Sequence, residues 1–172
     1  MNIMLDLETM GNGNRAAIIA IGAVSFDSSG IIDRFYRQVS LQSSVDIGME
    51  MDASTVLWWM KQSDEARSAF KGNESADHIA IALQDFAKWC ESVCENIDDL
   101  SVWGNGAAFD NTILSSAYRL AGIRQPWMFW GDKCYRTIKA MHPEVLLERA
   151  GTHHNAVDDA ESQANHLIKI IF

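Results

Sequence analysis

Two acidic residues near the start of the chain, Asp6 and Glu8, are spaced like a pair of metal ligands on a β-strand. Residues 2–8 alternate in polarity, and side chains two positions apart on a strand share a face. Both carboxylates therefore point to one side while Leu5 and Leu7 point into a core. Like charges repel, so a hard divalent cation such as Mg²⁺ would compensate the pair. For this pair considered alone, a solvent-facing edge of an exposed strand is the simpler explanation.

A third acidic residue, Asp110, follows the loop 104–109, which reads GNGAAF, and opens a segment with helical periodicity. Its side chain could cap the helix by accepting hydrogen bonds from unpaired backbone N–H groups. A carboxylate at the point where a central strand gives way to a helix also lies at the mouth of an α/β sheet, where ligands bind. The two roles are compatible in one residue.

The segment 153–160, HHNAVDDA, offers two His–Asp pairs with the same spacing, His153 with Asp158 and His154 with Asp159. The apolar stripe of the helix that follows fixes the inward direction. Asp159 flanks that stripe and Asp158 points nearly opposite to it, so Asp159 is the better candidate for a cleft. His154 lies just before the helix and can reach the same site, although an ordinary exposed histidine is the simpler explanation for either one alone. The stripe consists of Ala156, Ala160, Ala164, Leu167, Ile168 and Ile171.

The elements that must position these residues can be predicted from the hydrophobic periodicity, which changes along the chain from that of strands to that of helices. Three strands come first, followed by helices that alternate with two short strands. This order predicts a mixed sheet covered by helices. The expected strands are 2–8, 17–26, 31–40, 100–103 and a short aromatic one near 127–130; the expected helices are 53–71, 75–95, 110–121, 133–141 and one from about 155.

Length and composition favour a single domain over residues 1–172 with a sizeable core. No apolar run approaches the length of a membrane span, and the first residues lack the features of a secretory signal, so we expect a cytoplasmic protein without membrane contact. The net charge of −9 argues against a protein that coats nucleic acid by charge alone. A site made of carboxylates would instead recruit divalent cations, which supply the positive charge that a phosphate needs.

Three motifs follow one another along the chain: the acidic pair, the acidic residue after an Asn- and Gly-containing loop with a preceding Phe, and the segment at the last helix. They read Asp6-x-Glu8, Asp110 and His154-x-Ala156-x-x-Asp159-Ala160. Together they resemble the motifs of the DEDDh exonucleases, a family that includes the proofreading subunit of DNA polymerase and ribonuclease T. The two alanines match only the register that uses His154 and Asp159. Residues 6–11 and 58–67 are also similar to a narrower branch with phage 3′-5′ exodeoxyribonucleases and a bacterial 3′-5′ exoribonuclease.

The resemblance implies an α/β, ribonuclease H-like fold with a mixed five-stranded sheet, the first three strands antiparallel, flanked by helices. It implies a 3′-5′ exonuclease that acts on nucleic acid with a free 3′ end and releases nucleoside 5′-monophosphates. Two Mg²⁺ or Mn²⁺ ions about 4 Å apart would be held by Asp6, Glu8, Asp110 and Asp159, with Asp6 as the bridge. His154 would be the general base. The phage relatives favour DNA slightly over RNA, and dimers among relatives leave a homodimer open.

Further residues are candidates for substrate contacts. Thr9, Met10 and Asn105 neighbour the expected ligands in sequence and could contact the terminal nucleotide. Trp58 and Trp59 lie about 100° apart on a helix, so we do not expect both to be equally buried. Trp59 is the candidate for stacking on a base, with a core position as the simpler explanation. Five cations of the C-terminal half could line the path of the strand, although a solvated surface explains them more simply: Arg124, Lys133, Arg136, Lys139 and Arg149.

Three other classes of protein share part of this pattern. A haloacid-dehalogenase-type phosphatase needs a second aspartate where this chain has Glu8. A ribonuclease H-like endonuclease or resolvase would share the carboxylates but has no evident need for His154. A non-catalytic nucleic-acid-binding module would have lost a ligand, and the motifs retain all of them.

Overall fold

One mixed sheet of five strands forms the centre of the molecule, in the order β3-β2-β1-β4-β5. The computed structural model describes residues 1–149, 151 and 154–172. β1 pairs antiparallel with β2, and β2 with β3, whereas β4 is parallel to both β1 and β5. The mixed five-stranded sheet predicted from the sequence is therefore confirmed. The strands are β1 (Asn2–Thr9), β2 (Ile18–Asp27), β3 (Gly30–Gln38), β4 (Ser101–Gly104) and β5 (Asp132–Cys134).

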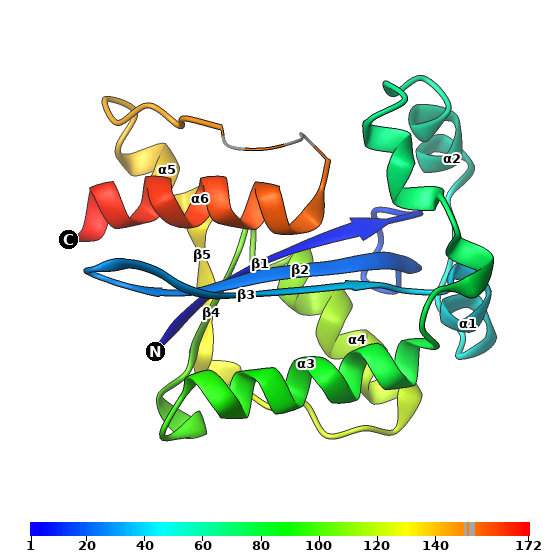
Figure 1. Cartoon of the computed structure of the whole chain (residues 1–172), viewed down its shortest axis with the longest axis horizontal. Helices are drawn as coiled ribbons and strands as arrows, with labels where there is room; N and C mark the ends of the chain where they lie inside the picture. The colour runs from blue at the N-terminus through cyan, green and yellow to red at the C-terminus, as the bar shows by residue number, and fades with distance from the viewer. Residues whose placement is uncertain (150, 152–153) are drawn as a thin grey trace.

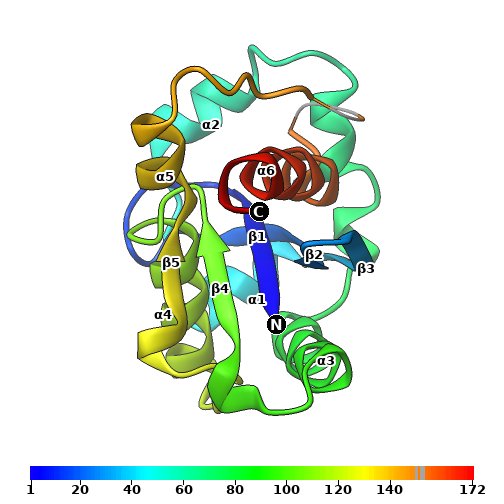
Figure 2. The ribbon, with the colours of Figure 1, turned by 90° about the vertical axis from the view of Figure 1, so that its left-hand side faces the viewer.

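Helices cover both faces of this sheet (Figures 1 and 2). The last two, α5 and α6, lie on one face, and α3 and α4 lie on the other. Residues 142–149, which follow α5, pass over α6 on the side away from the sheet. Within the described residues, no helix has the length and apolar character needed to cross a membrane. The helices are α1 (Leu41–Asp46), α2 (Ala53–Trp59), α3 (Ile79–Val93), α4 (Asp110–Ala121), α5 (Tyr135–Met141) and α6 (Ala156–Ile171).

Alternation along β1 divides its side chains between two cores. Leu5 and Leu7 belong to the larger core, which contains residues of α3 and α4, and Met4 belongs to a smaller one with residues of α5 and α6. Because successive side chains of a strand point to opposite faces, Asp6 and Glu8 share the face of Met4. The two carboxylates therefore lie on the α6 side of the sheet.

Two glycines let helix starts come close to the sheet. Gly22 pairs with Asp6 across β1 and β2, and a Cβ atom at Gly22 would lie only 2.2 Å from the carbonyl carbon of Ala156. A Cβ atom at Gly104 would lie 3.1 Å from the Cβ of Asp110. Because these two positions lack a side chain, the first turn of α6 packs against β2 and the first turn of α4 packs against the end of β4. Both strands are neighbours of β1, which carries the acidic pair.

Several element boundaries differ from the sequence-based expectation. The helix expected over 53–71 ends at Trp59, and a separate 3₁₀ turn covers Ala66–Phe70. The hydroxyl of Ser63 accepts a hydrogen bond from Ala66 N at 3.3 Å, a local bond that competes with a continuous helix. The helix expected over 75–95 is shorter, Ile79–Val93.

The strand expected near 127–130 does not form, and the edge strand of the sheet lies later in the chain, at Asp132–Cys134. Phe129–Gly131 form a 3₁₀ turn, and the edge strand β5 follows it. Trp127 is buried because its ring packs in the larger core, and its indole N–H donates to Asp132 Oδ1 at 2.8 Å. The aromatic run therefore reflects core packing and not strand pairing. The short helix α1, which the periodicity analysis did not predict, is capped by Ser40, whose side chain accepts from Ser43 N.

Candidate active site

A pocket of about 260 Å³ opens where β1 and β4 end. It brings together all five residues of the three sequence motifs, which come from β1, from α4 and from the beginning of α6. The pocket is lined by Asp6, Leu7, Glu8, Asn105, Phe109, Asp110, Arg136, Arg149, His154, Asp159 and Gln163.

The acidic pair on β1 is held in an environment that disfavours negative charge. Glu8 is 6% exposed, and burial, followed by the charges of Asp159 and Asp110, raises its pKa to about 8. Burial, followed by the charges of Asp110 and Glu8, also raises the pKa of Asp6 well above its usual range. A hydrogen bond of 2.8 Å from Gln163 Nε2 to Asp6 Oδ1 acts in the opposite direction. Burial therefore disfavours the charged form of both carboxyl groups, and a cation bound beside them would favour it.

Asp110 is the first residue of α4, but its carboxylate accepts hydrogen bonds from outside the helix. Oδ1 accepts from Leu7 N at 3.2 Å and Oδ2 from Asn105 N at 3.0 Å. The side chain is 2% exposed, and burial raises its pKa to about 7 although these bonds lower it. The residue thus ties β1 to the loop after β4 and holds its carboxylate beside the acidic pair.

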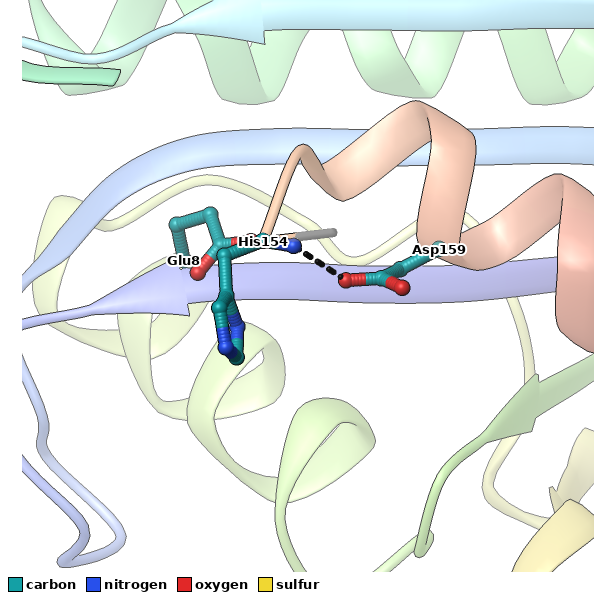
Figure 3. Close-up of side chains that lie close together, drawn as sticks. All are labelled: Glu8, His154 and Asp159. Carbon is teal, nitrogen blue, oxygen red and sulfur yellow. Dashed lines mark hydrogen bonds between the residues drawn. The ribbon is translucent and has the colours of Figure 1, made fainter. Parts of the chain in front are cut away.

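Asp159 lies on the first turn of α6 and is 8% exposed. Its Oδ2 accepts from His154 N at 2.9 Å, drawn in Figure 3, and its Oδ1 accepts from Arg149 at 2.6 Å. His154 has a left-handed backbone, with φ of 63°. One potential ligand atom each of Glu8, His154 and Asp159 lies within 4.8 Å of the others.

The alternative register is not supported by the position of Asp158. Its carboxylate faces Gly151, where a Cβ atom would lie 2.3 Å from Asp158 Cγ. His153 lies outside the described residues. The apolar stripe of α6 was therefore a sound guide to which aspartate enters the pocket.

The predicted substrate contacts are distributed differently from the expectation. Asn105 lines the pocket, whereas the side chains of Thr9 and Met10 are buried, with 7% and 5% exposed. Trp59 is only 3% exposed, and its indole N–H donates to Thr9 O at 2.9 Å. Trp59 is therefore a core residue, and the prediction that it stacks on a base is wrong. Trp58 is 42% exposed, and its ring centroid lies 5.0 Å from that of His154. The expectation of unequal burial is confirmed, and Trp58 is the indole available at the site.

Three polar residues of the pocket lie outside the motifs. Gln163 follows Asp159 by one helical turn and bonds Asp6. Arg149 pairs with Asp159, and Arg136 donates to the carbonyl of Asn105. The spacing of Gln163 from Asp159 was a signal that could have been used, since residues four apart share a helix face.

The strand order, the carboxylates on β1, α4 and α6 and the histidine before α6 form the arrangement expected for the DEDDh exonucleases that the motifs resemble. Similar solved structures include the nuclease domain of 3′hExo, a DEDDh family member bound to rAMP, with a TM-score of 0.66 and 15% identity over 99% of this chain and 90% of that chain. Another is Pop2p of S. pombe in its Mg²⁺- and Mn²⁺-bound form, with a TM-score of 0.59 and 15% identity over 98% and 82% of the two chains. At these identities the likeness is one of fold.

Residues 1–171 match the family described as the 3′-5′ exoribonuclease Rv2179c-like domain. The chain belongs to this family and is a 3′-5′ exonuclease. It is also 28% identical over 160 residues to a protein of Enterobacteria phage T4 named Exodeoxyribonuclease, with 79% of this chain and 69% of the phage protein covered.

Proposed function

We propose that Asp6, Glu8, Asp110 and Asp159 bind two Mg²⁺ or Mn²⁺ ions and that His154 is the general base for hydrolysis of the 3′-terminal phosphodiester bond. The observation that carries the proposal is that five side chains from distant parts of the sequence line one pocket. Three of the four carboxylates are less than 10% exposed. Carboxylates buried together in this way repel one another, and a divalent cation relieves that repulsion.

The donor set fits hard divalent cations, because it consists of carboxylate oxygens with a histidine at its edge. When bound by these carboxylates, such ions would supply a water of lowered pKa and positive charge to offset that of the phosphate. The Mg²⁺- and Mn²⁺-bound form of Pop2p, which shares the fold, agrees with this choice of metals.

The protein residues then have separable roles. Asp6 interacts electrostatically with the carboxylates of Asp110, Glu8 and Asp159, so it would share with them the binding of divalent cations. His154 accepts the proton of the attacking water on its imidazole, since the pKa of histidine suits base chemistry near neutral pH. Its backbone N–H bond to Asp159 fixes the turn that carries the ring.

The substrate we propose is a nucleic acid strand with a free 3′ end, and the product is a nucleoside 5′-monophosphate. DNA is the first candidate, because the phage relative is named Exodeoxyribonuclease. RNA is the second candidate, because the matching family is described by exoribonuclease activity. The side chain of Asn105 lines the pocket and could donate to or accept from a 2′-hydroxyl.

Matched DNA and RNA oligonucleotides labelled at the 3′ end test the proposal. We expect labelled mononucleotides from the first turnover with Mg²⁺ or Mn²⁺, no release with EDTA and none from Asp6→Asn with its fold intact by circular dichroism. A circular single strand distinguishes the alternatives, since an endonuclease would cleave it and an exonuclease would not. Wild-type rates for Asp6→Asn would contradict the metal assignment.

A further inference from the structure

A second groove, of about 480 Å³, adjoins the carboxylate pocket. It lies between α5 and the segment that follows it, and it shares Asn105 and Arg136 with the pocket. The two hollows therefore meet at these residues. The groove is lined by Asn105, Arg136, Lys139, Ala140, His142, Pro143, Val145, Leu146 and Leu147.

The two walls of the groove differ in chemistry. Arg136 and Lys139 are three residues apart on α5, so their side chains leave the helix on neighbouring positions. The opposite wall is mostly aliphatic, and its Leu146 is 76% exposed. Cations on one side and an exposed apolar surface on the other suit a ligand with a charged backbone and apolar faces.

The aliphatic wall is fixed to the core by a buried hydrogen-bond chain. His166 is 2% exposed, and its Nε2 lies 2.7 Å from Val145 O while its Nδ1 lies 2.8 Å from the hydroxyl of Tyr135. A carbonyl oxygen can only accept, so Nε2 donates to it and Nδ1 accepts from the tyrosine. The main chain of the wall is thus anchored to α5 and α6, and the groove is preformed.

We infer that this groove holds the nucleotides on the 5′ side of the bond that is cut, an inference that rests on the proposed function. An exonuclease that binds a 3′ end must accommodate the rest of the strand as it leaves the site. A chain with a net charge of −9 needs local cations for that purpose, and Arg136 stands at the junction of pocket and groove. Phosphates face Arg136 and Lys139, and sugars and bases lie on the aliphatic wall.

The hollow on the other side of Arg149 is less suited to the strand. It is lined by Ser28, Glu148, Lys169 and others, and the ammonium of Lys169 pairs with Glu148 at 3.0 Å. Glu148 would also face an approaching phosphate. The groove along α5 therefore offers the more favourable charge among the hollows that adjoin the pocket in the described part of the chain.

Substrate length provides the test. Lys139→Gln and Leu146→Ser change exposed groove side chains, so both variants should fold normally. A dinucleotide has a single phosphate, the one that is cut, so it does not reach the groove. We expect kcat/KM for the dinucleotide to stay within about twofold of wild type in both variants. For a 12-nucleotide single strand we expect KM to rise by about 3–10-fold. For Lys139→Gln the slope of log affinity against log salt should fall by about 0.7 for the long strand, one phosphate contact.

Lys88→Gln is the matched control, because Lys88 lies on α3, across the sheet, and is 74% exposed. It should leave both substrates unaffected. Binding of the 12-nucleotide strand to Asp6→Asn, with and without Lys139→Gln, followed by fluorescence anisotropy, gives a readout that does not depend on turnover. Equal effects on both lengths, or none, would overturn the groove assignment. A wild-type protein that releases no mononucleotides from any strand would instead refute the proposed function.

Discussion

At the scale of single residues, the hydrogen bonds that orient the carboxylates matter as much as the carboxylates themselves. Gln163 holds one oxygen of Asp6, and Asp159 accepts from both Arg149 and the backbone of His154. Partners of metal ligands set ligand orientation and basicity. The chemistry of the site therefore depends on residues that carry no motif of their own.

Replacing Gln163 by leucine tests its positioning role. Gln163 is 4% exposed, and its Oε1 is buried without a hydrogen-bond partner among the described residues, so leucine should be tolerated by the fold. Without the bond that lowers the pKa of Asp6, we expect affinity for Mn²⁺ to fall by about 10-fold, measured calorimetrically on the protein alone. Gln42→Leu, an exposed change on α1, is the control. Unaltered Mn²⁺ affinity in Gln163→Leu would show that Gln163 only fills space.

Replacing His154 by asparagine separates base chemistry from backbone conformation. Asparagine adopts the left-handed region more readily than alanine, so His154→Asn keeps the turn at φ of 63° and its N–H bond to Asp159. Loss of a general base should lower kcat by about 10²–10⁴-fold with Mn²⁺ affinity retained. Single-turnover kinetics across pH would measure this. Unchanged kcat would move the base role to His153 or to no histidine.

At the scale of elements, close helix-to-sheet contact determines whether the carboxylates meet. The periodicity of α6 predicted correctly that Asp159 and not Asp158 enters the pocket, because an apolar stripe fixes the orientation of a helix. The spacing of Gln163 from Asp159 predicts that both residues face the pocket, but it could not reveal that the Gln163 amide donates to Asp6, because that bond joins α6 to β1. Periodicity also could not decide which of Trp58 and Trp59 is buried, because the helix ends there and the choice depends on packing against Phe70 and Thr9.

Gly22→Ala should displace α6. The new Cβ would meet backbone atoms of Ala156 and Val157 at 2.2–2.3 Å, which no side-chain rotation can relieve. We expect a loss of about 1–3 kcal/mol in the free energy of unfolding, with a larger proportional loss of activity because Asp159 moves away from β1. Urea denaturation and mononucleotide release measure the two effects. Gly13→Ala is the matched control, since a Cβ there meets nothing within 4 Å. Equal behaviour of the two variants would contradict the prediction.

At the scale of the whole molecule, the buried carboxylates link folding to pH and to metal. Burial raises the pKa of Glu8 from 4.5 to about 8 and that of Asp110 from 3.8 to about 7. At a pH between the ordinary pKa of each carboxyl group and its raised pKa in the folded chain, the folded chain keeps a proton that the unfolded chain has lost. The free energy of unfolding therefore decreases as pH rises through this range. Cations that bind the deprotonated carboxylates oppose the decrease.

Thermal unfolding in EDTA and in Mn²⁺ tests this linkage. In EDTA we expect Tm to fall as pH rises from about 5 to 8, by more than the ~2–4 °C that 1 kcal/mol produces in a domain of this size. Mn²⁺ should raise Tm more at pH 8 than at pH 5.5. Glu8→Gln, which removes one titrating group, should flatten the EDTA profile. A profile in EDTA that rises with pH, or that is unchanged in Glu8→Gln, would contradict the burial argument.

The anchor of the groove wall has a consequence for how such an enzyme diversifies. His166 holds that wall through the main-chain oxygen of Val145, an atom that every amino acid possesses. Side chains at positions 146 and 147 can therefore be exchanged by mutation without loosening the scaffold or approaching the acidic residues. The preference for one nucleic acid over another can then change by mutation of the groove while the residues that carry out hydrolysis stay the same.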